Sequence, residues 1–183
     1  NSAAALKRVN TPAVGLNSSF FRQTGGRIHP AFTKVTQTLD ATYDDGPGDD
    51  FNPNSFLVRS EGVLTAPSSG NYKFKVIVDG YAELRIDNIR IANGRDGEFT
   101  GTSRFEAGIP KAIALNFTQE TAPGSVSVLW STEGLTEEAI PASALATHVA
   151  MTDDEVAELA KHDITSRGGD ARKYGDPIVI EIR

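Results

Sequence analysis

The sequence predicts an all-β fold, an antiparallel two-sheet β-sandwich that carries a short helix and strand at its C-terminal end. Seventeen Gly and nine Pro divide the 183 residues at short intervals, and the runs between them alternate with period two, as strands do. This alternation leaves one face of each strand polar, which is typical of antiparallel sheets. No helical periodicity appears before residue 150, and many short strands of this kind form a sandwich or a barrel.

Strands are predicted in chain order at residues 56–64, 71–79, 81–86, 89–91, 111–118 and 125–131. The clearest is 71–79, in which one face consists of Tyr72, Phe74, Val76 and Val78. Asp87-Asn88 predicts a tight hairpin turn, because both residue types tolerate positive φ. The parity of Trp130 with Val126 and Val128 predicts that it packs in the core.

Two stretches, 25–53 and 93–104, lack clear alternation and are expected to be irregular. The first is rich in Thr, Asp, Gly and Pro and is longer than most loops.

The C-terminal part of the chain has a different character. Thr152-Asp153-Asp154-Glu155 is a capping box and predicts a helix that ends near Asp163. A linker is expected at 167–170 and a short terminal strand at 178–182. The predicted organisation is an N-terminal extension (1–13), a sandwich (14–146) and an appendage (147–183) that docks on the sandwich or on a protein partner.

The composition excludes several classes of protein. The chain has 24 Asp and Glu, 18 Lys and Arg, a net charge of -6 and no cysteine. Disulfides, zinc-thiolate sites and thiol nucleophiles are therefore excluded. The net acidity argues against a nucleic-acid binder, and no apolar run approaches the ~20 residues of a membrane helix.

No catalytic constellation is visible, so an enzyme is not predicted. Glu158 and His162 are one helical turn apart, but they lack the H-E-x-x-H spacing of a zinc protease.

The acidic stretch 44–52 offers four carboxylates and an amide to a calcium ion, yet its spacing is not that of an EF-hand. A solvated turn is the favoured interpretation. Tyr43 and Tyr81 are the candidates for stacking on a sugar.

Six short motifs, taken together and in order, resemble one family. Residues 56–74 contain R-x-x-G-x-L-x-A-P followed by G-x-Y-x-F, and residues 78–88 contain an acidic loop followed by L-x-I-D. The others are the opening strand 15–21, the F-E-A-G of 105–108, the tryptophan strand 128–131 and the I-P-x-S-x-L of 140–145. Over residues 14–146 the chain is similar to the protective-antigen-type ("PA-fourteen") β-sandwich family.

The resemblance implies a sandwich of secreted and cell-surface proteins. Its lectin members hold calcium through two consecutive aspartates joined by a cis peptide, and the ion orients two sugar hydroxyls. At these positions this chain has Val78 and Asp79. Asp79 is therefore the one residue of this pair that is expected to coordinate a metal ion. The peptide bond between Val78 and Asp79 is expected to be trans.

The ligand-binding residues expected around this position are Asp79, Gly80 and Tyr81, with Gln119 and Glu120 from a second loop. Glu83 is a further oxygen donor that could rescue metal binding. No cofactor is expected, and calcium is the one possible ion, at Asp79.

The functional expectation is a non-catalytic extracytoplasmic recognition or interaction module. It would be a structural or docking unit of a larger envelope or surface protein, with a degenerate calcium and sugar site and a protein partner bound through 147–183. It would be periplasmic, secreted or at the cell surface, without nucleic-acid binding or membrane insertion. The alternative is a calcium-assisted carbohydrate-binding adhesin or enzyme-accessory domain with a glycan ligand.

Overall fold

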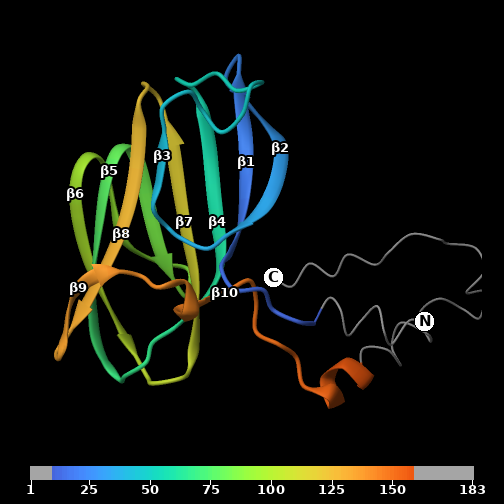
Figure 1. The fold of residues 1–183 in the computed structure, drawn as a ribbon, viewed down its shortest axis with the longest axis vertical. Coiled ribbons are helices and arrows are strands. Elements are labelled where there is room, and N and C mark those ends of the chain that lie inside the picture. The colour runs from blue at the N-terminus through green and yellow to red at the C-terminus, as the bar shows by residue number, and fades with distance from the viewer. Residues whose placement is uncertain (1–9, 159–183) are drawn as a thin grey trace, which may run out of the picture. The chain divides into compact units, whose positions relative to one another are not determined.

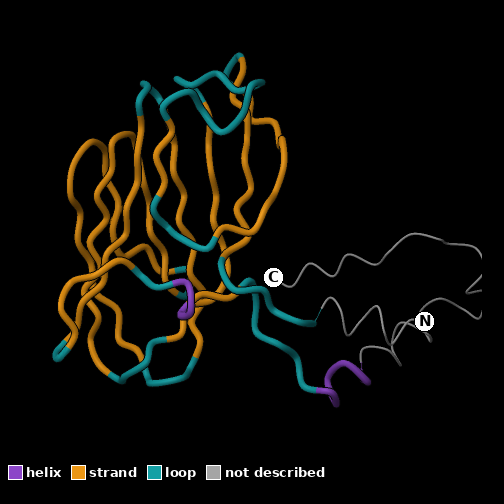
Figure 2. The backbone as a smooth tube through the Cα atoms, in the orientation of Figure 1, coloured by secondary structure: helices purple, strands orange, loops and turns teal. Residues whose placement is uncertain are grey.

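In a computed structural model of the chain, the described residues are 10–158, and they are built mainly of strands (Figures 1 and 2). In chain order the elements are β1 (Leu16–Thr24), β2 (Arg27–Thr36), β3 (Ala41–Tyr43), β4 (Phe56–Thr65), β5 (Gly70–Ile86), β6 (Ile89–Phe105), β7 (Pro110–Gln119), β8 (Gly124–Thr132), β9 (Leu135–Ala139), the 3-10 helix η1 (Ala142–Ala144) and β10 (Leu145–Ala146).

The long strand β5 joins the two layers of an antiparallel sandwich. The strand order is β2-β1-β4-β7-β5-β8-β3, with β6, β9 and β10 added to β5, β8 and β4. Residues 73–79 of β5 pair with β8, whereas residues 81–86 pair with β7. A strand that changes sheet through a bend is a known way to make the corner of a sandwich. The predicted all-β sandwich is confirmed.

The core lies between the two layers and follows the predicted alternation. Phe74, Val76, Leu84, Leu115, Val128 and Trp130 are all buried, as expected. Trp130 contacts Tyr72 at a ring-centroid distance of 5.0 Å, and Tyr72 contacts Phe105 at 5.4 Å. Val78 is 3% exposed, so it continues the core face of β5.

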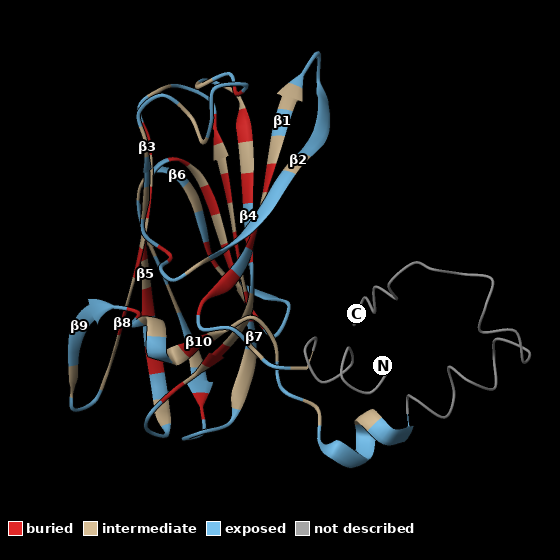
Figure 3. Ribbon diagram, turned by 45° about the vertical axis from the view of Figure 1, so that its right-hand side comes forward, coloured by how far each residue is buried: buried red, intermediate tan, exposed pale blue. Residues whose placement is uncertain are grey.

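The prediction of irregular structure was wrong for part of the first stretch and for all of the second. Residues 25–53 contain β2 and β3, and residues 93–104 lie inside β6. Among the described strands, β2 pairs with β1 and β6 pairs with β5. Such border strands are exposed along much of their length, and Figure 3 shows this for β2. Their side chains therefore do not show the apolar alternation from which a strand is predicted.

The predicted turn and helix start are present. Asp87 and Asn88 have φ of 50° and 63°, the values that a type I′ hairpin turn requires. The Thr152 amide donates to Glu155 Oε2 over 2.8 Å, and the Glu155 amide donates to Thr152 Oγ1 over 3.2 Å. This is the reciprocal capping box, and residues 153–158 are helical. The end of that helix near Asp163, the linker 167–170 and the strand 178–182 lie outside the described residues.

The chain divides into two units, one of residues Pro12–Val149 and one that combines Asn1–Thr11 with Ala150–Arg183. In the first unit the two ends of the sandwich are joined, because Val14 forms a bridge with Ala146 and the Thr147 amide donates to the Ala13 carbonyl over 3.0 Å. In the second unit Asn10 exchanges two hydrogen bonds with the backbone of Met151. Within residues 10–158, no helix combines the length and apolar character needed to cross a membrane.

Candidate functional site

The bend of β5 at Gly80 is fixed by its neighbours. Gly80 has φ +116°, and its amide donates to Asp96 Oδ1 over 2.9 Å. The β5–β6 register shifts between Val78 and Tyr81, opposite Asp96 and Gly97, so both strands bend at the same place. A side chain at Gly80 would place its Cβ 2.9 Å from the Thr118 carbonyl oxygen. The position therefore requires glycine both for its φ and for its close approach to β7.

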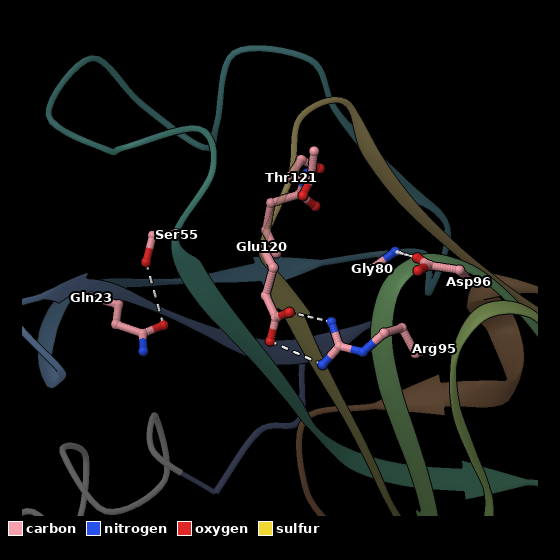
Figure 4. Close-up of polar contacts among 8 residues, drawn as sticks. Gln23, Ser55, Gly80, Arg95, Asp96, Glu120 and Thr121 are labelled. Atoms are coloured by element: carbon pink, nitrogen blue, oxygen red, sulfur yellow. Dashed lines mark hydrogen bonds and ion pairs between the residues drawn. The ribbon is translucent and has the colours of Figure 1, made fainter.

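An ion pair connects this bend to the β7–β8 loop (Figure 4). Arg95 Nη2 donates to Glu120 Oε1 over 3.0 Å, and Nη1 donates to the second oxygen of the same carboxylate. These hydrogen bonds lower the pKa of the Glu120 carboxyl and raise that of the Arg95 guanidinium. The guanidinium also lies 5.9 Å from the centre of the Tyr81 ring. Because both ions are about half exposed, the pair fixes geometry more than it adds stability.

Gln119 closes the β7–β8 turn from the inside. Its side chain is fully buried, and Nε2 donates to the carbonyl of Thr121. Its Oε1 is a buried oxygen without a hydrogen-bond partner in the described structure, and a Cβ on Gly124 would clash with it. The same loop is attached to the 44–55 stretch, because the Ala122 amide donates to Asn54 Oδ1 over 2.7 Å.

The structure brings four of the five predicted ligand-binding residues into one arrangement. Gly80 and Tyr81 form the bend, while Gln119 and Glu120 form the adjoining turn. Tyr81 and Thr118 are paired in the sheet register. The fifth residue, Asp79, is exposed on β5 opposite Ser125. The peptide bond between Val78 and Asp79 is trans.

The oxygen donors of this site are a poor match for calcium, which prefers six to eight oxygens with several carboxylates. Both oxygens of Glu120 are bound to Arg95. Glu83, the other possible donor, accepts from Arg85 Nε over 2.6 Å and lies 3.6 Å from Arg90 Nη1. The hydrogen bond from Arg85 lowers the pKa of Glu83. No group of three or more His, Asp or Glu side chains suited to a metal occurs in residues 10–158.

The two tyrosines proposed for sugar stacking occupy different environments. Tyr43 is half-buried, and its ring packs against the core. Its ring stacks on Phe117 at 5.5 Å and contacts Phe56 at 5.2 Å, and burial raises its pKa to about 12. Tyr81 is half-buried beside Arg95, which leaves only part of its ring accessible.

The acidic stretch 44–52 has the features of a solvated turn. All four of its aspartates are exposed, while Phe51 is buried and anchors the loop against Phe32 and Phe56. Asp50 lies 3.8 Å from Arg22. A second contact at this end of the sandwich joins Ser55 Oγ to Gln23 Oε1 over 3.4 Å (Figure 4).

Arg95 and Asp96 were missed from the sequence. Asp96-Gly97 is a residue pair typical of turns, and Asp96 has a positive φ of 48°. Only the pairing of β6 with β5 places these residues beside Gly80 and Tyr81, and that register cannot be read from β6 alone. His162, which is one helical turn from Glu158 in the sequence, lies outside the described residues.

Comparison with solved structures finds the same fold in proteins of low sequence identity. An anti-sigma factor domain-containing protein from Clostridium clariflavum has a TM-score of 0.67 and 24% identity, covering 76% of this chain and 49% of that chain. The A domain of epithelial adhesin 6 from Candida glabrata, solved in complex with Galβ1-3GlcNAc, has a TM-score of 0.63 and 12% identity over 78% of this chain and 91% of its own. A PA14 sugar-binding domain from an RTX adhesin has a TM-score of 0.61 and 15% identity, covering 74% and 99% of the two chains.

Among curated proteins, the anti-sigma-I factor RsgI3 of Acetivibrio thermocellus is 23% identical over 120 residues, which are 62% of this chain and 19% of that protein. This chain thus spans about a fifth of RsgI3 and about half of the anti-sigma structure. The family model of the PA14 domain matches residues 12–144, which is more than half of the chain. These residues carry the strands β1 to β9 and the helix η1, and the chain therefore belongs to the PA14 domain family.

Proposed function

We propose that this chain is a non-catalytic interaction module of an extracytoplasmic protein, in which the calcium and sugar site of the lectin-type members has been replaced by an internal ion pair. The observation that carries the proposal is the contact between Arg95 and Glu120. It joins β6, beside the β5 bend, to the β7–β8 loop with a protein cation, and it occupies both oxygens of a carboxylate that a metal would need. The buried Val78 removes a further carboxylate from the same place.

The module acts as a structural or docking unit of a larger envelope or surface protein. Two facts support this. The two anti-sigma relatives extend well beyond the matching region. The ends of the sandwich also meet at Val14 and Ala146, so the module can stand between two flanking segments. Residues 147–183 provide one surface for a protein partner. The adhesin neighbours support an extracellular or cell-surface location.

The test is calorimetry with millimolar calcium on the full chain, together with thermal melts with and without a chelator. Binding to the native state raises stability by RT ln(1 + [L]/Kd), so a site of even modest affinity shifts the melting temperature. We expect no heat and no shift for the wild type and for the matched control Asp79→Ala. Arg95→Ala frees both oxygens of Glu120 without placing a charge in the core, and is expected to gain a weak calcium-dependent shift.

Micromolar calcium binding by the wild type that disappears in Asp79→Ala would overturn this proposal. It would favour a second function, a calcium-assisted carbohydrate-binding module. The observation in favour of that alternative is the adhesin domain bound to Galβ1-3GlcNAc, which has the same fold. Titration of this disaccharide with and without calcium therefore belongs in the same experiment.

A further inference from the structure

The β1–β2 hairpin is a basic region of an acidic protein. Every one of the 24 Asp and Glu residues lies at or after position 40, so β1 and β2 contain none, while the chain as a whole has a net charge of -6. The hairpin carries Arg22, Arg27 and Lys34, together with His29. One acidic neighbour from another element, Asp50, lies 3.8 Å from Arg22, and the cations of β2 face no such partner among the described residues.

Strand β2 is also an open edge of the sheet. In the part of the chain that the structure describes, β2 pairs with β1 and with no other strand. It is exposed along nearly its whole length, as the pale blue colour in Figure 3 shows. Three of its apolar side chains are exposed, Ile28 at 54%, Phe32 at 39% and Val35 at 46%. An exposed edge with apolar side chains is a template on which another strand can pair.

The usable part of this edge is Ala31–Thr36. Pro30 has no amide hydrogen to donate, and the β1–β2 register shifts between Phe20 and Phe21, which leaves Ala31 as an extra residue. Beyond that bulge the pairing is regular up to Thr36. Lys34 Nζ lies 5.1 Å from the centre of the Phe20 ring and 6.0 Å from that of Phe32. Its charge is therefore held over an apolar surface at the middle of the open segment.

We propose that the 31–36 edge of β2 is a docking site for an extended acidic segment of a protein partner, which adds to the sheet as a further strand. Backbone hydrogen bonds supply part of the affinity, and acidic side chains complement Lys34 and Arg27. Charge decides between the possible occupants. A second copy that presented the same edge would bring one hairpin that has cations and no carboxylates against another, and like charges across paired strands are unfavourable. This inference rests on the proposed role as an interaction module, but it concerns a different face from the β5 bend.

The experiment uses the full chain and three synthetic peptides of the length of β2, which has 10 residues. The first alternates Glu and Val, the second replaces each Glu by Lys, and the third keeps Glu but replaces each Val by Pro so that it cannot form a strand. Binding is followed by fluorescence anisotropy, and backbone protection by hydrogen exchange. We expect the first peptide to bind about tenfold or more tightly than either control, to weaken with salt, and to protect amides in residues 31–36.

A matched pair of variants locates the site. Lys34→Glu is expected to weaken the Glu-Val peptide about tenfold, whereas Lys73→Glu, which changes an exposed lysine on β5, leaves the affinity unchanged. Equal binding of the proline peptide would mean attraction of any polyanion and would overturn strand addition. Protection outside β2, absence of binding, or self-association of the chain through β2 would overturn it as well. None of these readouts involves calcium or a glycan, so their failure leaves the proposed function to its own test.

Discussion

Phe74 on β5 lies directly opposite Trp130 on β8, and both side chains are buried. The Phe74 ring also contacts Phe105, the last residue of β6, at a centroid distance of 6.0 Å. Trp130 in turn contacts Tyr72 and donates from its Nε1 to Glu138 Oε1 on β9 over 3.2 Å. One cluster of contacts therefore holds β5, β6, β8 and β9 together.

Removal of the Phe74 ring is expected to be costly. The side chain is fully buried, so Phe74→Ala leaves a cavity and should lower the free energy of unfolding by ~3–5 kcal/mol. Ile89→Ala is the matched control, because Ile89 is 67% exposed and should change stability by less than ~0.5 kcal/mol. Urea unfolding measures both. Equal small effects would mean that position 74 is not in the core.

A side chain at Gly80 is expected to strain the corner of the sandwich. Gly80→Ala adds a Cβ at φ +116°, 2.9 Å from the Thr118 carbonyl oxygen. Gly108→Ala is the control, since Gly108 also has a positive φ, +74°, but has no atom within 4 Å of the added Cβ. The control should lose ~1–2 kcal/mol from the backbone alone, and Gly80→Ala should lose clearly more. If thermal melts show equal losses, the approach to β7 is not restrictive.

The sequence was sufficient for the strands whose two faces differ in environment. The central part of β5, with Tyr72, Phe74, Val76 and Val78 inside, could be predicted because burial of one face imposes alternation. β2 could not, because its residues are exposed on both faces and Pro30 argued against a strand. The same limit applied to the site. Residues near Gly80 in the sequence were found, whereas Arg95 is brought there only by the β5–β6 register.

Tyr43 is expected to make the protein sensitive to alkali. Burial raises its pKa from 10.0 to about 12, so above pH 10 the unfolded chain loses this proton before the folded protein does. Stability is therefore complete below pH 10 and falls between pH 10 and 12 by about 1.4 kcal/mol per pH unit from this group. Other groups also titrate there, so the informative quantity is the difference between the wild type and Tyr43→Phe.

That difference is measured by urea unfolding at pH 8 to 11, with tyrosinate absorbance as a second readout. Tyr43→Phe should lose the tyrosine titration step that belongs to a pKa of about 12. It should also become more stable than the wild type, relative to their values at pH 8, as the pH rises above 10. A parallel decline of both proteins would show that Tyr43 ionises as a solvent-exposed tyrosine does.

The sandwich is expected to fold without its flanking segments. Residues Pro12–Val149 form one unit, and its two ends are joined by the Val14–Ala146 bridge and by hydrogen bonds between Ala13 and Thr147. A fragment of residues 12–149 keeps all of these contacts and should melt within a few degrees of the full chain.

A shorter fragment, 16–144, removes the bridge, the hydrogen bond from the Gly15 amide to the Leu145 carbonyl, and the strand β10 that pairs with β4. It also removes the buried side chain of Leu145, whose loss alone should cost ~2 kcal/mol or more. Circular dichroism and thermal melts compare the three proteins. Melting of 12–149 far below the full chain would show that the flanking segments are part of the sandwich, and equal melting of 16–144 would show that the closure of the two ends contributes nothing.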